Sequence, residues 1–181
     1  MVAQEPTQSL RQQLEETGGF ERIIVSSDEP LSLAQLTTRA KLVVEATVAY
    51  SQSHVDDSGA DVYTDYTITV ASVMKNREQS VVQAGDLLTV RRRHGVVVVD
   101  GRSAAVFENG FPGFQPGERY VLFLTRGTRE YVYAVLGGNQ GAFTAGETIA
   151  PVAMSLDGAT TRSTRTEFLG ELQALLKSAD Y

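Results

Sequence analysis

Two long runs of alternating apolar and polar residues constrain this chain more than any other feature of its sequence. In the first run, from Leu42 to Tyr50, every second residue is apolar. In the second, over 62–74, Tyr66, Ile68 and Val70 fall on one side of an extended chain. A period of two residues is typical of a strand with one buried face. Asp, Ser and Gly residues between the runs favour a turn, so the runs are expected to form a long antiparallel hairpin.

Shorter apolar segments later in the chain predict further strands. They lie at 87–93, 96–99, 104–107, 119–125 and 130–136. The glycine-rich segment 137–141 is interpreted as a bulge or corner, where glycine lets a strand bend. Five or six antiparallel strands with short helices at both ends fit a mainly β fold, and more narrowly a small closed five-stranded barrel of the OB type. The hairpin and loop over 96–118 occupy the position where many OB folds have a helix.

Three helices are predicted from the spacing of their first residues. Ser9, Ser32 and Thr164 are each followed three positions later by Gln or Glu, which is the spacing of a capping box. The third helix carries an apolar stripe with Leu172 at its middle. That stripe predicts a helix that covers one side or end of the sheet.

The length of 181 residues suits one domain with a sizeable core. Residues 1–19 are expected to form a flexible lead that contains a short helix, with its first eight residues disordered. Residues 20–181 are expected to form the single domain, which begins with an edge strand over 20–25. No segment approaches the roughly 20 apolar residues that a membrane-spanning helix needs, so no membrane span is expected.

The net charge of −6 and the absence of cysteine exclude several classes of function. Nucleic acid is an unlikely partner, because phosphate binding relies on Lys and Arg that displace counterions. Without cysteine there are no disulfides, thiolate nucleophiles or thiolate metal sites. Residues 1–6 lack the basic start and apolar run of a signal peptide, but they would suit a mature exported chain.

The order of these elements resembles a known module. A short helix runs into the strand Lys41–Val48, the turn Asp57–Gly59 and the long strand Tyr66–Lys75, and Gln115–Leu124 later precedes a closing helix. Over residues 31–176 this arrangement resembles the netrin-like OB-fold module of the tissue inhibitors of metalloproteinases, and exported bacterial domains of the same plan. The resemblance implies a barrel that works outside the cytoplasm, extracellular or periplasmic, as a non-catalytic binding or protein-interaction module.

One departure limits what this resemblance implies. The metalloproteinase inhibitors reach the protease zinc with a disulfide-linked amino-terminal cysteine, and this chain has none. The inhibitory chemistry is therefore carried over to no residue here. The expected partner is an unknown protein or small ligand. A small enzyme whose site assembles from scattered polar residues remains the alternative.

The strand end Arg91–His94 is the one positive clue to a site. Alternation places Arg91 and Arg93 on one face of the strand and Arg92 and His94 on the other. Arg91, Arg93 and His94 are therefore candidates for an anion or single-stranded nucleic-acid site, a known use of OB folds. The other interpretation is a solvated strand end whose arginines pair with carboxylates. An anion site should lack such carboxylates, whereas a structural strand end should have one for each arginine.

The remaining polar clusters predict no catalytic residue, no metal site and no cofactor. Asp56, Asp57 and Asp61 do not have the spacing of a calcium-binding EF-hand loop and are interpreted as a hairpin tip. The only histidines, His54 and His94, are in no zinc-binding spacing. The phosphate-binding P-loop pattern and the Gly-x-Ser-x-Gly pattern of a nucleophilic serine are both absent.

Three aromatic residues flank a loop rich in glycine and proline. Phe107, Phe111 and Phe114 have two open interpretations. They either plug one end of the barrel or present an apolar contact surface to a partner.

Overall fold

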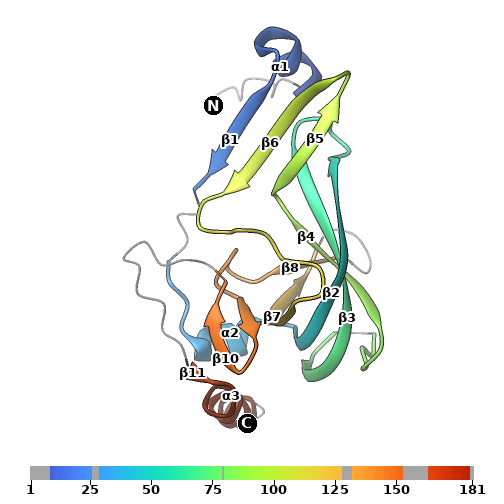
Figure 1. Cartoon of the computed structure of the whole chain (residues 1–181). Helices are drawn as coiled ribbons and strands as arrows, with labels where there is room; N and C mark the ends of the chain where they lie inside the picture. The colour runs from blue at the N-terminus through green and yellow to red at the C-terminus, as the bar shows by residue number, and fades with distance from the viewer. Residues whose placement is uncertain (1–8, 26–28, 79, 128–131, 153–162, 180–181) are drawn as a thin grey trace, which may run out of the picture.

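The computed structural model describes residues 9–25, 29–78, 80–127, 132–152 and 163–179. The expected mainly β fold is confirmed (Figure 1). The helices are α1 (Leu10–Thr17), α2 (Leu33–Arg39) and α3 (Arg165–Ala179). The strands are β1 (Phe20–Ile24), β2 (Leu42–Val55), β3 (Val62–Asn76), β4 (Leu87–Arg92), β5 (Gly95–Val99), β6 (Arg102–Glu108), β7 (Arg119–Arg126), β8 (Val132–Val135), β9 (Ala142–Ala145), β10 (Thr148–Pro151) and β11 (Ser163–Thr164). Among the described residues, no helix is long and apolar enough to cross a membrane.

The predicted capping boxes form. At α1 the Ser9 side chain accepts from the Gln12 amide, and the Gln12 side chain accepts from the Ser9 amide. Gly18 then ends the helix in the left-handed conformation, with φ of 75°. Leu10 and Leu14 of α1 are buried, so over 9–19 the expected lead packs against the rest of the protein. Its expected disordered part, residues 1–8, lies outside the described residues.

The long hairpin is confirmed, but its first strand is buried on both faces over most of its first half. Residues 42–46 and Val48 of β2 are all buried, which corrects the expectation of one buried and one exposed face. Tyr50, expected on the buried side, is 58% exposed. The register between β2 and β3 shifts between Val48 and Tyr50, and residues 49–52 of β2 are exposed.

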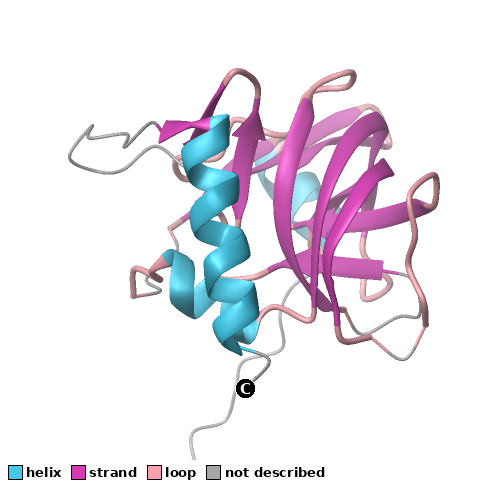
Figure 2. Cartoon of the chain, turned by 90° about the horizontal axis from the view of Figure 1, so that it is seen from below, coloured by secondary structure: helices cyan, strands magenta, loops and turns pink. Residues whose placement is uncertain are grey.

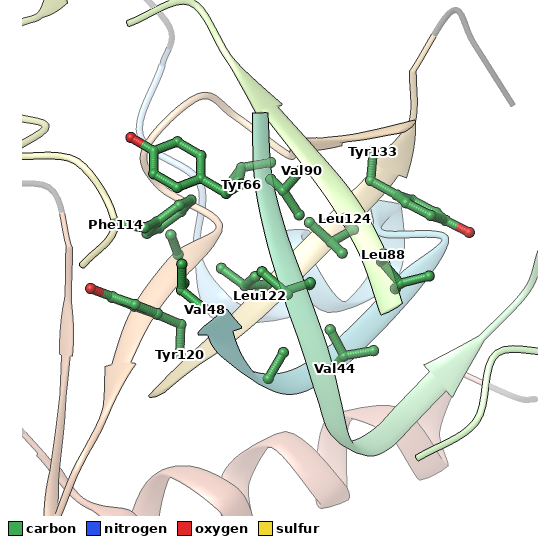
Figure 3. Packing of buried hydrophobic residues seen from close by; sticks show 14 of the residues in the cluster. Val44, Val48, Tyr66, Leu88, Val90, Phe114, Tyr120, Leu122, Leu124 and Tyr133 are labelled. Carbon is green, nitrogen blue, oxygen red and sulfur yellow. The ribbon is translucent and has the colours of Figure 1, made fainter. Parts of the chain in front are cut away.

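Five strands pair in a ring. In the larger sheet β7, β2, β3, β4 and β8 are consecutive neighbours, and β8 also pairs with β7. Their apolar side chains meet in the main core, together with Phe111 and Phe114 of the loop after β6 (Figure 3). The expectation of antiparallel pairing alone is wrong for β8. That strand runs parallel to β4 and antiparallel to β7.

A second core lies between the ring and the helices α2 and α3. It contains Val43 of β2, Phe123 of β7 and Leu172 of α3, all with no exposed surface. Figure 2 shows α2 and α3 side by side against the strands, as predicted for the last helix. The carboxylate of Glu45, buried in β2, accepts from Arg119 of β7 at 3.4 Å and from Arg165 of α3 at 2.6 Å. This ion-pair group joins α3 to two strands.

A separate three-stranded sheet stands beside the upper half of the β2–β3 hairpin (Figure 1). Its order is β1, β6, β5, with β1 parallel to β6 and β5 antiparallel to β6. The predicted turn between β5 and β6 is confirmed, with positive φ at Asp100 and Gly101. One face of this sheet packs against α1 and the hairpin in a third core that includes Leu14, Val62 and Val106.

Candidate functional site

The two arginines proposed to share an anion site each have a carboxylate partner. The Arg91 guanidinium donates to both carboxylate oxygens of Asp65, at 2.6 and 2.7 Å. Arg93 pairs with Asp61 through its Nε. Asp65 and Asp61 lie on or next to β3, the strand that pairs with β4. Of the two arrangements that the sequence allowed, this is the one expected of a structural strand end.

Arg92 points to the opposite side and is almost completely buried. Its guanidinium donates to the Gly138 carbonyl at 2.5 Å and also binds Glu108 and Asn139. It lies over the Phe111 ring at 4.5 Å from the ring centre. The glycine-rich corner, where Gly137 and Gly138 both have positive φ, supplies two of these contacts. Sequence reasoning predicted the corner but not the cation that it holds.

His94 is brought together with aromatic rings and not with the exposed arginines. Its ring makes edge contacts with Phe107 and Phe111 at centroid distances of 5.5 and 5.4 Å. Nδ1 is buried and has no hydrogen-bond partner among the described residues. Burial lowers the pKa of His94, Glu108 opposes this effect, and Arg92 adds to it. The nearby Thr64 hydroxyl donates to the His94 carbonyl rather than to its ring, so this is not a nucleophile paired with a base.

A shallow surface pocket of about 270 Å³ lies beside the same strand end. It is lined by Arg91, Arg92 and Arg93 together with Glu108 and a mainly apolar wall of Ile24, Ala134, Val135 and Gly138. The pocket does not include His94. Because each arginine already has a carboxylate partner, an incoming anion would have to compete with carboxylates that are held in place.

The acidic hairpin tip is held by its own hydrogen bonds. Asp56 accepts from the Ser58 hydroxyl at 2.5 Å and from the amides of Ala60 and Asp61 at 2.8 and 2.9 Å. Burial works to raise the pKa of Asp56, but these hydrogen bonds outweigh it and the pKa is lowered. Within the described ranges no group of three His, Cys, Asp or Glu residues could hold a metal ion.

The feature that sequence reasoning missed is the side of the three-stranded sheet that faces away from the third core and, among the described residues, carries exposed apolar side chains. We call it the open face. It consists of Glu21 and Ile23 of β1, Val96 and Val98 of β5, and Ser103 and Ala105 of β6. These side chains alternate with the residues that form the third core. Ile23 is 62% exposed, Val96 48% and Val98 71%.

The sequence shows only part of the alternation between the open face and the buried face of this sheet. In β5 the four residues Val96–Val99 are all valine, so the sequence shows no contrast between an inner and an outer side. Such a run is typical of a strand buried on both faces. In the structure only Val97 and Val99 pack into the third core.

The structure buries two of the three aromatic residues at this loop, and the third is half-buried. Phe111 and Phe114 are buried in the main core, with an edge contact of 5.0 Å between their ring centres. Phe107 lies opposite Ile23 in the register of β6 and β1, and it is half-buried next to His94.

No family model matches this chain, and no curated protein is similar to it in sequence.

Proposed function

We propose that this protein is a non-catalytic interaction module that binds another protein through the open face. The observation that carries the proposal is the exposure of Ile23, Val96 and Val98 on one side of a small sheet. Scattered exposed apolar residues are common, but apolar residues gathered on one sheet face are typical of an interaction site. Exposed valine side chains are unfavourable in water, and a bound partner would remove their apolar surface from water.

The partner is a different protein with positive charge near its apolar contact. Glu21 is exposed within the open face, and the whole chain carries a net charge of −6. Two copies of such a chain repel each other over long range, whereas a basic partner is attracted. The charge therefore favours a heterologous partner over a second copy.

The proposal also includes the type of fold. The ring of β7, β2, β3, β4 and β8 supports a small closed OB-type barrel, and the barrel supports the resemblance to the netrin-like module. That resemblance in turn favours an exported protein, extracellular or periplasmic. In this proposal the barrel is a rigid support, and the three-stranded sheet attached to it carries the binding surface.

Site-specific photocrosslinking tests the open face. Benzoylphenylalanine is placed at Val96 or Val98 in the full chain, in the cells that produce it, with exposed Gln173 of α3 as the matched control position. We expect the same crosslinked protein from both valine positions and not from position 173. Excess wild-type chain should compete this product away, and the Val98→Asp chain should not. Products shared with position 173, or none from either valine position, would reject the proposal.

A further inference from the structure

In the described part of the chain, the outer edge of β1 pairs with no other strand. In the three-stranded sheet β1 pairs with β6 on one side, and no strand of the described ranges pairs with its other side. Its five residues pair with β6 in an unbroken register from Phe20 to Ile24, so no bulge bends it away. It contains no proline. A regular, unpaired strand edge can pair with a further strand. Proteins commonly block such edges with bulges or prolines.

The direction of one carbonyl identifies the free backbone groups. The Ile24 carbonyl accepts from the Asn109 amide, at the end of β6, over 2.8 Å. In a strand the amide and carbonyl of one residue point to the same side, and successive residues alternate. The groups of Phe20, Arg22 and Ile24 therefore point toward β6. Those of Glu21 and Ile23 point to the free edge, and the side chains of the same two residues lie on the open face.

We propose that the partner adds an extended strand to this edge of β1, pairing antiparallel with Glu21 and Ile23. The inference rests on the proposed function, because it specifies how a partner protein would engage the open face. The added strand would continue the sheet, and its alternate side chains would extend the open face. Main-chain hydrogen bonds would supply affinity, and the side chains opposite Glu21 and Ile23 would supply specificity.

The charge of Glu21 indicates which residues the added strand would carry. In an antiparallel pair, directly opposite residues have their side chains on the same face, and opposite charges there are favourable. A Lys or Arg therefore faces Glu21, and an apolar residue faces Ile23. A second copy of β1 would meet like charges in two of its possible registers. A twofold axis at Glu21 sets two carboxylates opposite each other, and one at Arg22 sets two guanidinium groups opposite each other.

A proline placed at the free edge separates strand addition from simple contact with the open face. Glu21→Pro removes an amide that points outward and puts a ring in the path of the added strand, while the bonds to β6 remain. Glu21→Ala removes the same carboxylate and keeps the amide, so it is the matched control. Both variants keep Ile23, Val96 and Val98.

The probe is a display library of random dodecapeptides, selected on the wild-type chain. We expect enriched peptides in which apolar residues alternate with others and a basic residue is included. Glu21→Pro should weaken their binding about tenfold or more beyond Glu21→Ala, since several main-chain hydrogen bonds are lost together. Sedimentation of the wild-type chain alone should show a monomer. A dimer that Glu21→Pro dissociates would identify a second copy as the occupant and overturn the inference.

Hydrogen exchange gives a readout that does not depend on the folding of any variant. In the free wild-type chain the amides of Glu21 and Ile23 should exchange quickly, while those of Arg22 and Ile24 are protected by β6. Bound peptide should slow the first pair and leave the second pair unchanged. Failure to enrich any peptide, equal binding to the two variants, or no protection at Glu21 and Ile23 would overturn strand addition. Crosslinks from Val96 and Val98 would still support the open face in that case.

Discussion

Arg91 and Asp65 stand directly opposite each other on β4 and β3, and two hydrogen bonds of 2.6 and 2.7 Å join their charged groups. The neighbouring Arg93 pairs with Asp61 through its Nε. Hydrogen bonding to Asp65 raises the pKa of Arg91, burial opposes the effect, and the guanidinium stays charged. The most basic segment of the chain is therefore locally neutralised.

The double variant Arg91→Ala with Arg93→Ala should keep its fold and its response to polyanions. Partly exposed pairs of this kind contribute only about 0–1 kcal/mol each. Titration with a panel of polyanions, including single-stranded oligonucleotides at low salt, checks the response. We expect equal or absent binding in both proteins. Wild-type binding that disappears in the variant would instead establish an anion site.

Leu172→Ala should lower the free energy of unfolding by about 2–5 kcal/mol, as for other leucines removed from a packed core. Leu172 has no exposed surface and lies in the second core between α3 and the strands. Chemical denaturation measures the change. Gln173→Ala, at the adjacent exposed position, should change stability by less than about 0.5 kcal/mol. A loss below about 1 kcal/mol for Leu172→Ala would show that α3 is not packed as described.

Gly95→Ala should destabilise the junction of the two sheets. A Cβ at Gly95 would lie closer than 3.0 Å to both the Ser53 and Thr64 hydroxyl oxygens, and φ there is 134°. The expected cost is about 2 kcal/mol or more, from steric overlap added to backbone strain. Gly101→Ala is the control, because it has positive φ but nothing within 4 Å of its Cβ. Equal thermal melting of the two variants would contradict the close approach of β5 to the hairpin.

Stability should fall as the pH drops below 6.5, and His94 should be one cause. Its pKa in the folded protein is below the usual 6.5, through burial first and then Arg92, with Glu108 opposing. Below pH 6.5 the unfolded chain therefore binds more protons than the folded chain, so acid favours unfolding. Above pH 6.5 both forms are neutral, and the stabilising contribution of His94 is fully present.

His94→Phe should flatten the stability profile between pH 6.5 and about 5.5, where carboxylates contribute little. Phenylalanine keeps the edge contacts with Phe107 and Phe111 and removes the buried Nδ1. Urea unfolding across the pH series is the measurement. An unchanged slope in His94→Phe would contradict the assignment.

The sequence by itself determined the features that depend on near neighbours. The caps at Ser9 and Ser32 need a partner three residues away, and the turn at Asp100 and Gly101 needs only a tolerated φ. The two alternating runs predicted the hairpin, because a strand reveals its buried side every second residue. The apolar stripe through Leu172 predicted a covering helix in the same way.

Only the tertiary structure decided what those elements meet. Arg91 and Asp65 are 26 positions apart, and their pairing follows from the register of β3 and β4. The second buried face of β2 exists because α2 and α3 pack over it. The four valines of β5 are alike in sequence. Only packing against α1 and the hairpin partly buries Val97 and Val99 and leaves Val96 and Val98 outside. Burial depends on which surfaces the folded chain brings together, and local spacing carries no record of that.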